Sequence, residues 1–161
     1  MNFNPIETLE YSLTKTEYFK ILIENRLRRY WYLYLMIVGG GLFLLTNSAD
    51  NPLFILIAFA SFIYVLGIFI YLYYWAYSDK NKILFLKRKL GVNENGITVS
   101  TESGSRGEIP FGYLLNVVER KNYWLLYIAL GQFVYVPKEA FKNHADFAGF
   151  REILKTKAKT K

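Results

Sequence analysis

The chain has 161 residues, of which 53% are hydrophobic and 19% aromatic, and it carries a formal net charge of +7. This length accommodates a pair of membrane spans and one small extramembrane domain, but no second domain. The absence of cysteine excludes disulfides, thiolate nucleophiles and thiolate metal ligands, and with them a secreted disulfide-rich module.

The N-terminal segment, residues 1–29, predicts a strand followed by a helix. Residues 8–13 alternate between polar and apolar side chains, as a half-buried strand does. Thr14 and Glu17 then have the spacing of a capping box, in which each residue satisfies a backbone N–H of the other. We expect the helix that begins here to continue without a break into the apolar run that follows.

Two apolar runs, residues 30–46 and 53–77, contain no Asp, Glu, Lys, Arg or His over 17 and 25 residues. Crossing a hydrocarbon core of about 30 Å takes about 20 helical residues. Residues 47–52 between the runs are too few to form a domain, so the pattern predicts a transmembrane helical hairpin with an external turn. The lack of ionisable groups in either run disfavours a transporter or channel. Small residues allow close helix packing, at Gly39, Gly40, Gly41, Ala58, Ala60, Ser61 and Gly67.

The charge distribution predicts the orientation of the hairpin. Residues 1–29 contain five Lys or Arg, residues 78–161 contain fifteen, and the turn contains none. Basic residues concentrate on the cytoplasmic side of a membrane. Both termini are therefore predicted to be cytoplasmic, and the tyrosines and tryptophans at the cytoplasmic ends of the two runs agree with this orientation.

Residues 78–161 predict a cytoplasmic α+β domain. We expect a short helix over 79–90, followed by antiparallel strands at 96–100, 107–110, 114–119, 123–130 and 132–136, each bounded by turn residues. Pro137 should end the last strand, because it cannot donate a ladder hydrogen bond. Asn143 should then cap a C-terminal helix whose apolar stripe, Phe147, Phe150, Ile153 and Leu154, covers the sheet.

Several motifs of this domain resemble the YcxB-like bacterial membrane proteins. They are Gly96-Ile97, the segments 108–111 and 117–127, and the segment 134–141 with its Pro-Lys-x-x-Phe ending; Tyr11-Ser12-Leu13-Thr14 resembles the start of that family. The resemblance implies two transmembrane helices and a C-terminal domain with a small pleckstrin-homology-like antiparallel sheet or barrel, capped by a helix. It also implies a bacterial plasma (inner) membrane, and it supplies no catalytic residues.

The sequence offers little for catalysis. The single histidine, His144, is expected in solvent, and the carboxylates have no paired spacing. Phosphate-loop, dinucleotide and metal-binding motifs are missing from the sequence. We therefore expect a protein that is not an enzyme and that uses no cofactor or metal. Nucleic acid is also not expected as a partner, because the aromatic residues near Trp124 fit a sheet core better than a stacking platform.

The function predicted from the sequence is binding by the cytoplasmic domain. The ligand is an anionic lipid headgroup or a protein partner, and the basic residues around Lys80–Lys89 either only set the topology or also bind lipid. One alternative, by analogy of fold, is an immunity or self-protection factor against a membrane-active bacteriocin-type peptide. Unpaired sheet edges also allow a homodimer. The candidate binding residues are Lys80, Lys82, Lys87, Arg88, Lys89, Arg106, Arg120, Lys121 and Lys138.

Overall fold

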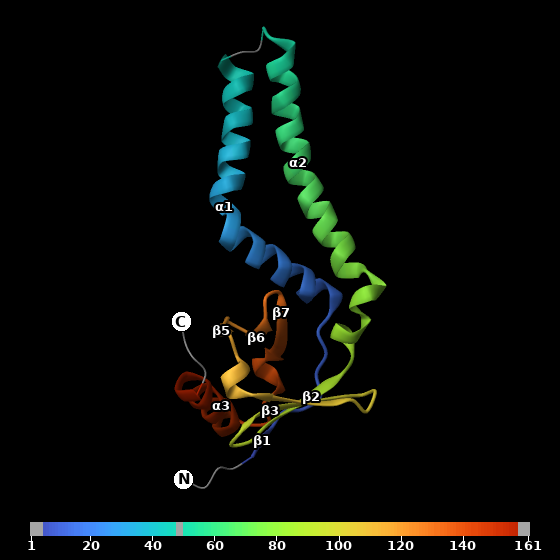
Figure 1. Cartoon of the computed structure of the whole chain (residues 1–161), viewed down its shortest axis with the longest axis vertical. Helices are drawn as coiled ribbons and strands as arrows, with labels where there is room; N and C mark the ends of the chain where they lie inside the picture. The colour runs from blue at the N-terminus through green and yellow to red at the C-terminus, as the bar shows by residue number, and fades with distance from the viewer. Residues whose placement is uncertain (1–4, 48–49, 158–161) are drawn as a thin grey trace. The chain divides into compact units, whose positions relative to one another are not determined.

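The computed structural model describes residues 5–47 and 50–157, which form two compact units. The helical unit is Thr14–Ile83. The sheet unit combines the N-terminal segment up to Leu13 with the chain from Leu84 onward. The helical unit is thus inserted, in chain order, between two parts of the sheet unit (Figure 1).

The helical unit contains α1 (Lys15–Asn47), α2 (Pro52–Tyr77) and most of the 3-10 helix η1 (Asp79–Phe85). The predicted capping box is confirmed, because the Glu17 amide donates to Thr14 Oγ1 at 3.2 Å and the Thr14 amide donates to Glu17 Oε2 at 2.9 Å. Asn51 begins α2 by accepting from the Leu53 amide at 3.0 Å. The start of each long helix is therefore encoded locally.

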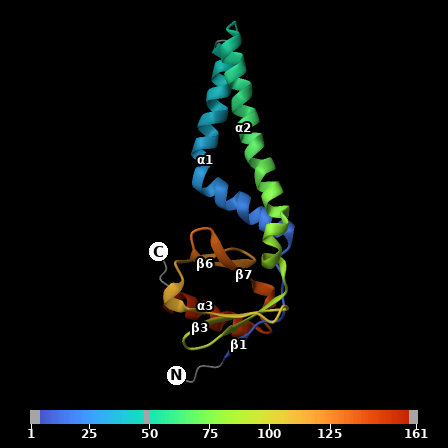
Figure 2. The same ribbon diagram turned by 45° about the vertical axis from the view of Figure 1, so that its right-hand side comes forward.

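The expectation of an unbroken first helix is wrong at one residue. Tyr30 has φ −127° and ψ 15°, outside the helical range, and α1 changes direction along its length (Figures 1 and 2). Side chains connect the two sides of this bend, since Arg26 Nε donates to Tyr34 Oη at 2.9 Å and the Arg26 guanidinium lies 4.6 Å from the Tyr30 ring centroid. A bend held by side-chain contacts cannot be recognised in the sequence from a proline or glycine.

The two long helices pack closely at one of the predicted small residues. A Cβ on Gly41 would lie 3.5 Å from the Ala58 carbonyl oxygen, and Ala58 is fully buried. At Gly39, Gly40 and Gly67 a Cβ would meet no atom within 4 Å, so close packing there, predicted from the sequence, is not found. Both helices are long and apolar enough to cross a membrane, and only 6% of the most apolar window of each is buried.

The sheet unit contains two antiparallel sheets and a C-terminal helix. The first sheet has the order β1 (Ile6–Glu7), β2 (Arg88–Val92), β3 (Gly96–Thr101), β4 (Arg106–Pro110), and the second has the order β5 (Asn116–Glu119), β6 (Tyr123–Ala129), β7 (Gln132–Pro137). Short 3-10 helices, η2 (Phe111–Tyr113) and η3 (Lys138–Ala140), precede β5 and follow β7, and α3 (His144–Lys157) ends the described chain. The predicted strands and last helix are confirmed, and β7 ends at Pro137 as expected.

Two predicted boundaries of this unit need correction. The helix expected over 79–90 ends at Phe85, and Arg88–Val92 is the strand β2. These residues form a strand because they pair with β1 on one side and β3 on the other, which is tertiary pairing that local pattern does not reveal. The N-terminal strand lies at Ile6–Glu7, and within the predicted range of 8–13 only Thr8 and Tyr11 form single bridges.

The N-terminal strand is held to β2 by buried polar contacts. Ile6 pairs with Val92 and Glu7 with Gly91. Thr8 is fully buried, and its Oγ1 accepts from the Leu90 amide at 2.9 Å. The residues that make this contact are separated by 82 positions, so the first sheet closes across the whole inserted hairpin.

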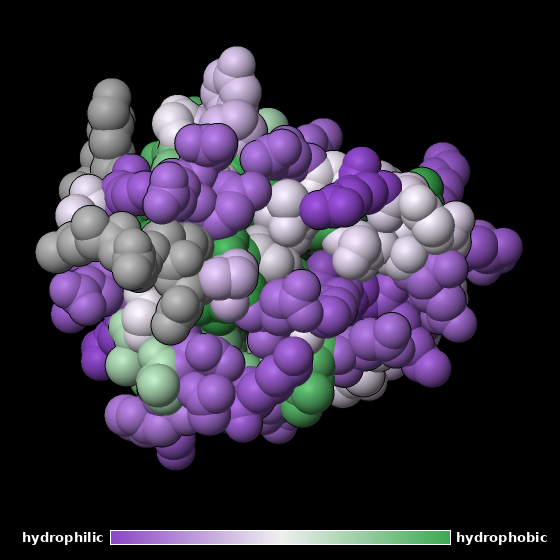
Figure 3. All heavy atoms as spheres, turned by 90° about the horizontal axis from the view of Figure 1, so that it is seen from below, coloured by the Kyte–Doolittle hydropathy of each residue, from purple (hydrophilic) through white to green (hydrophobic). Residues whose placement is uncertain are grey.

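The core of the sheet unit lies between the sheets and α3. Trp124 of β6 is 1% exposed, and its ring centroid lies 5.3 Å from that of Phe150 on α3. On the same helix Gly149 faces Ile6 of β1, whose Cδ1 would lie 3.2 Å from an added Cβ. The helix therefore contacts both sheets, and its cap is the predicted one, since Asn143 Oδ1 accepts from the Asp146 amide at 2.7 Å. The surface drawn in Figure 3 is mainly hydrophilic.

Replacing Gly96 with alanine is expected to destabilise the sheet unit strongly. An added Cβ would overlap the Ile109 carbonyl oxygen and lie 2.8 Å from Pro110 Cα, and these backbone atoms cannot move aside without breaking the β3–β4 pairing. Overpacking of this kind costs about 1–3 kcal/mol. Thermal unfolding of the full chain in detergent measures the effect. Gly107→Ala in β4 is the matched control, since its Cβ meets no atom within 4 Å; equal stability of the two variants would contradict the prediction.

Candidate functional site: a polar pocket on the first sheet

The first sheet carries two polar rows on one of its faces. Lys89, Ser100 and Arg106 stand opposite one another on β2, β3 and β4. The neighbouring row on the same face contains Glu7, Gly91, Thr98 and Glu108, because alternate residues of a strand share a face. Leu90, Val92 and Ile97, at intervening register positions, are buried. This alternation places basic, hydroxyl and carboxylate groups together on the face away from the core.

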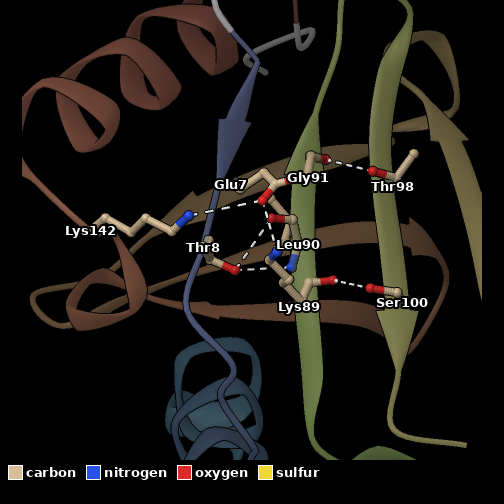
Figure 4. Close-up of polar contacts among 8 residues, drawn as sticks. All are labelled: Glu7, Thr8, Lys89, Leu90, Gly91, Thr98, Ser100 and Lys142. Carbon is tan, nitrogen blue, oxygen red and sulfur yellow. Dashed lines mark hydrogen bonds and ion pairs between the residues drawn. The ribbon is translucent and has the colours of Figure 1, made fainter.

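The middle of this face is hollow because Gly91 has no side chain. Thr98 Oγ1 donates to the Gly91 carbonyl at 3.2 Å, and a Cβ on Gly91 would lie 2.6 Å from that hydroxyl (Figure 4). Ser100 Oγ likewise donates to the Lys89 carbonyl at 3.3 Å. The result is a pocket of about 190 Å³ lined by Glu7, Lys89, Leu90, Gly91, Thr98, Ser100 and Arg106.

Glu7 organises the basic groups at one side of the pocket. Its Oε2 lies 2.7 Å from Lys89 Nζ and 3.9 Å from Lys142 Nζ (Figure 4). The hydrogen bond from Lys89, followed by the charges of Lys89 and Lys142, holds the pKa of the Glu7 carboxyl below its ordinary value. Glu7 therefore stays ionised at neutral pH and orients Lys89, while Arg106 lines the same pocket from β4. Two cations in a small polar hollow suit a phosphate-like anion.

The remaining predicted basic residues lie elsewhere. Lys80 and Lys82 belong to the helical unit, where Lys82 pairs with Asp79 at 3.6 Å with both side chains exposed. Lys87 is exposed before β2, and Lys121 is exposed in the turn between β5 and β6 beside the half-buried Arg120. Lys138 is the first residue of η3, directly after the second sheet. Of the predicted set, the structure places Lys89 and Arg106 at one pocket.

Arg88 has a structural position, although the sequence groups it with the surface lysines. Its residue exposure is 9%, and its Nη2 donates to the Leu84 carbonyl at 2.6 Å. Its backbone also pairs with that of Tyr11 at 2.8 and 2.9 Å. Burial lowers the pKa of the guanidinium, an effect that the nearby Tyr11 partly opposes. A side chain so placed joins the N-terminal segment to β2 and is not available to a surface ligand.

Lys138 belongs to a separate ionic cluster on the second sheet. Its Nζ lies 2.9 Å from Glu119 Oε1, while Arg151 Nε lies 3.3 Å from Glu119 Oε2. Lys138 also lies 4.9 Å from the Trp124 ring centroid. Burial raises the pKa of Glu119, but the hydrogen bond and charge of Lys138, together with Arg151, outweigh burial and lower it overall. This cluster ties β5, η3 and α3 together.

The Glu119 cluster predicts a pH dependence of stability. Because the pKa of Glu119 is lower in the folded chain than its ordinary 4.5, its contribution is complete above pH 4.5 and is lost as the pH falls through the folded pKa. Exposed ion pairs contribute about 1 kcal/mol or less. Glu119→Gln should therefore lower the unfolding temperature at neutral pH. In acid, the unfolding temperatures of the variant and the parent chain should become equal. Glu139→Gln, an exposed neighbour, is the control, and a constant difference for Glu119→Gln across the series would refute the prediction.

Sequence reasoning missed four polar side chains at or beside the pocket: Glu7, Thr98, Ser100 and Lys142. Thr98 and Ser100 alternate with Ile97 and Val99 along β3, so their shared face was detectable from the period of two. Glu7 carried no such signal, since it reaches the pocket through pairing with a strand more than 80 positions away.

The fold defines a class of protein: a small antiparallel sheet domain with a C-terminal helix, interrupted after its first strand by a pair of long apolar helices. Residues 92–154 match the model of the family described as YcxB-like protein. The resemblance seen in the sequence motifs is confirmed over these residues, while Tyr11–Thr14 lies outside the match. The comparisons with curated proteins and with solved structures give no match.

Proposed function

We propose that the protein is an integral membrane protein with two spans, contributed by α2 and the part of α1 that follows its bend. At 1.5 Å per residue the 26-residue α2 extends about 39 Å, enough for a core of about 30 Å. The apolar side chains of both helices are largely exposed, as expected of side chains that contact lipid, including Leu35, Phe43, Leu56 and Ile63 at 64–67%.

The pairing of β1 with β2 supports an even number of crossings. These strands flank the hairpin in the chain and belong to one sheet, so both ends of the hairpin must lie on the same side of the membrane. A chain with one crossing could not form this sheet. Following the distribution of Lys and Arg, the sheet unit is cytoplasmic at a bacterial plasma membrane.

The sheet unit is proposed to be pleckstrin-homology-like. The antiparallel sheets of the sheet unit, with four and three strands, and the C-terminal helix that follows them support this proposal. Here the transmembrane hairpin is inserted between the first and second strands.

The function we propose is non-catalytic binding of an anionic lipid headgroup in the pocket of the first sheet. The observation that carries the proposal is the row of Lys89, Ser100 and Arg106 across three strands beside an organising carboxylate, Glu7. Arg106 supplies a planar fork of donors and Lys89 a compact charge, a combination suited to a phosphodiester. A membrane-anchored domain encounters such headgroups at high local concentration.

The test uses the full chain in neutral detergent with glycerophosphoglycerol, the deacylated headgroup of phosphatidylglycerol. A ligand of the folded state raises the unfolding temperature in proportion to its occupancy. We expect millimolar glycerophosphoglycerol to stabilise the chain more than glycerophosphocholine does, and Lys89→Gln/Arg106→Gln to abolish the difference. The matched control, Lys87→Gln/Lys121→Gln, removes the same charge outside the pocket.

Two results would count against this proposal. Equal losses in the two double variants would mean that diffuse charge, and not the pocket, attracts the anion. No stabilisation of the parent chain by either compound would remove the headgroup as ligand and favour the protein partner instead.

A further inference from the structure

A second pocket, of about 280 Å³, lies within the helical unit and is unrelated to the sheet. It is lined by Arg26 of α1 and by one face of α2, where Tyr64, Gly67, Ile68, Tyr71 and Leu72 follow helical spacing. The lining is apolar except for the Arg26 guanidinium and the hydroxyl groups of Tyr64 and Tyr71. Arg26 is therefore the only charged group among the described residues that line this pocket.

The pocket exists because α1 and α2 touch on either side of it. Toward the turn, Gly41 packs on Ala58 with a Cβ-to-carbonyl distance of 3.5 Å. Toward the start of α1, the Phe19 and Tyr73 ring centroids lie 5.6 Å apart. Between these contacts an added Cβ on Gly67 meets no atom within 4 Å. The bend of α1 at Tyr30 lies in this interval along the chain.

Arg26 is held in place by contacts that leave part of its guanidinium for a ligand. Nε donates to Tyr34 Oη at 2.9 Å, and the guanidinium carbon lies 4.6 Å from the Tyr30 ring centroid. The planar group has further N–H donors beyond Nε, in the fork geometry that matches a phosphate. No carboxylate is among the described residues that line the pocket, so the charge of Arg26 is not neutralised from within it.

We propose that this pocket binds one anionic phospholipid from the bilayer, with its phosphate on Arg26 and an acyl chain along Gly67, Ile68 and Leu72. A single cation at the edge of an apolar wall complements an anionic headgroup joined to a hydrocarbon chain, whereas a free phosphate would leave the wall unused. The pocket holds only part of a lipid, and the rest remains in the bilayer. This site rests on the proposed insertion of the hairpin, and it is independent of the headgroup pocket on the sheet.

Tryptophan quenching by brominated lipids tests the proposal on the full chain reconstituted in vesicles. Trp75 reports on the pocket, because its ring stacks on that of the lining Tyr71 with centroids 6.5 Å apart. Trp124 is buried in the sheet unit and gives an unquenched background. All chains carry Trp31→Phe, which removes the other exposed tryptophan. The measured quantity is the relative binding constant of brominated phosphatidylglycerol over brominated phosphatidylcholine.

Two variants and two matched controls separate this site from general attraction to the membrane. Arg26→Gln should lower the preference for phosphatidylglycerol about tenfold, as expected from losing hydrogen bonds to a charged group. Arg28→Gln, two residues away and exposed, should retain the preference. Gly67→Leu should also abolish it by filling the pocket, while Gly39→Leu, another open glycine, should not. Helical content by circular dichroism checks that each variant folds.

Each other outcome overturns the inference. Equal losses for Arg26→Gln and Arg28→Gln would indicate surface charge alone, and retention by Gly67→Leu would mean that no lipid occupies the pocket. A parent chain without preference would exclude a selective site. If neither lipid quenched Trp75, the hairpin would not be inserted in the bilayer. That result would refute the proposed membrane insertion, whereas the outcomes above refute only the lipid site.

Discussion

A fragment that begins at Leu84 is expected not to fold, although it contains all the residues that match the YcxB-like family. It lacks β1 and the segment after it, whose Ile6, Tyr11 and Leu13 are each 8% exposed or less in the sheet unit. Burial of such side chains contributes about 1.5–3 kcal/mol each. The total, about 5 kcal/mol or more, is comparable to the whole stability of a small domain.

Restoring the missing segment should restore folding. A chain in which a flexible Gly/Ser linker of about eight residues joins residues 1–13 to residue 84 keeps β1 and omits the two long apolar helices. We expect cooperative thermal unfolding and a near-ultraviolet circular dichroism signal from Trp124 in the linked chain, and neither in the fragment. A fragment from Leu84 that unfolds cooperatively at the same temperature as the linked chain would refute the role assigned to β1.

Trp124→Ala is expected to cost the sheet unit about 3–5 kcal/mol, the range for removing a large aromatic side chain from a core. Trp124 is 1% exposed and lies at the centre of an aromatic cluster, with ring centroids at 5.8 Å from Phe141, 5.2 Å from Phe147 and 5.3 Å from Phe150. The cavity would lie where β6 meets η3 and α3. Neighbouring groups could fill it only if α3 moved relative to the sheet.

Urea unfolding of the linked chain or thermal unfolding of the full chain measures this loss. Leu130→Ala is the control, since Leu130 is 94% exposed in the β6–β7 turn and should change stability little. If Trp124→Ala were tolerated as well as Leu130→Ala, the tryptophan would not be the centre of the core. Trp124→Phe, which keeps most of the ring contacts, should recover a large part of the stability.

Local features of the fold were predictable because their causes lie within a few residues. The capping box of Thr14 and Glu17, the stop at Pro137 and the cap at Asn143 each act over one helical turn or one strand end. The strands from Gly96 to Pro137 likewise follow from alternation and turn residues. Features that depend on distant partners were not predictable, and the first three residues of β2 were assigned to a helix because the pairing of β2 with β1 crosses the hairpin.

The candidate site shows the same division. Basic residues could be counted from the sequence, but whether each faces solvent, the core or a pocket depends on the register of paired strands. Arg88 and Lys89 are neighbours in the chain, yet one is buried against the N-terminal segment and the other lines the polar pocket, since adjacent residues of a strand point to opposite faces. Arg26 lines the pocket between α1 and α2 with residues of α2 that lie about 40 positions further along the chain, a proximity that the sequence pattern did not reveal.

By itself the sequence determined that the protein has two long apolar helices joined by a short turn, followed by an antiparallel domain with YcxB-like motifs and an excess of basic residues. Length, hydropathy and alternation are properties of contiguous residues, so they need no knowledge of the fold. Only the tertiary structure decided that the domain begins before the hairpin, with β1, and which charges meet in a pocket. Strand pairing and burial bring together residues about 80 positions apart, and no local pattern encodes that contact.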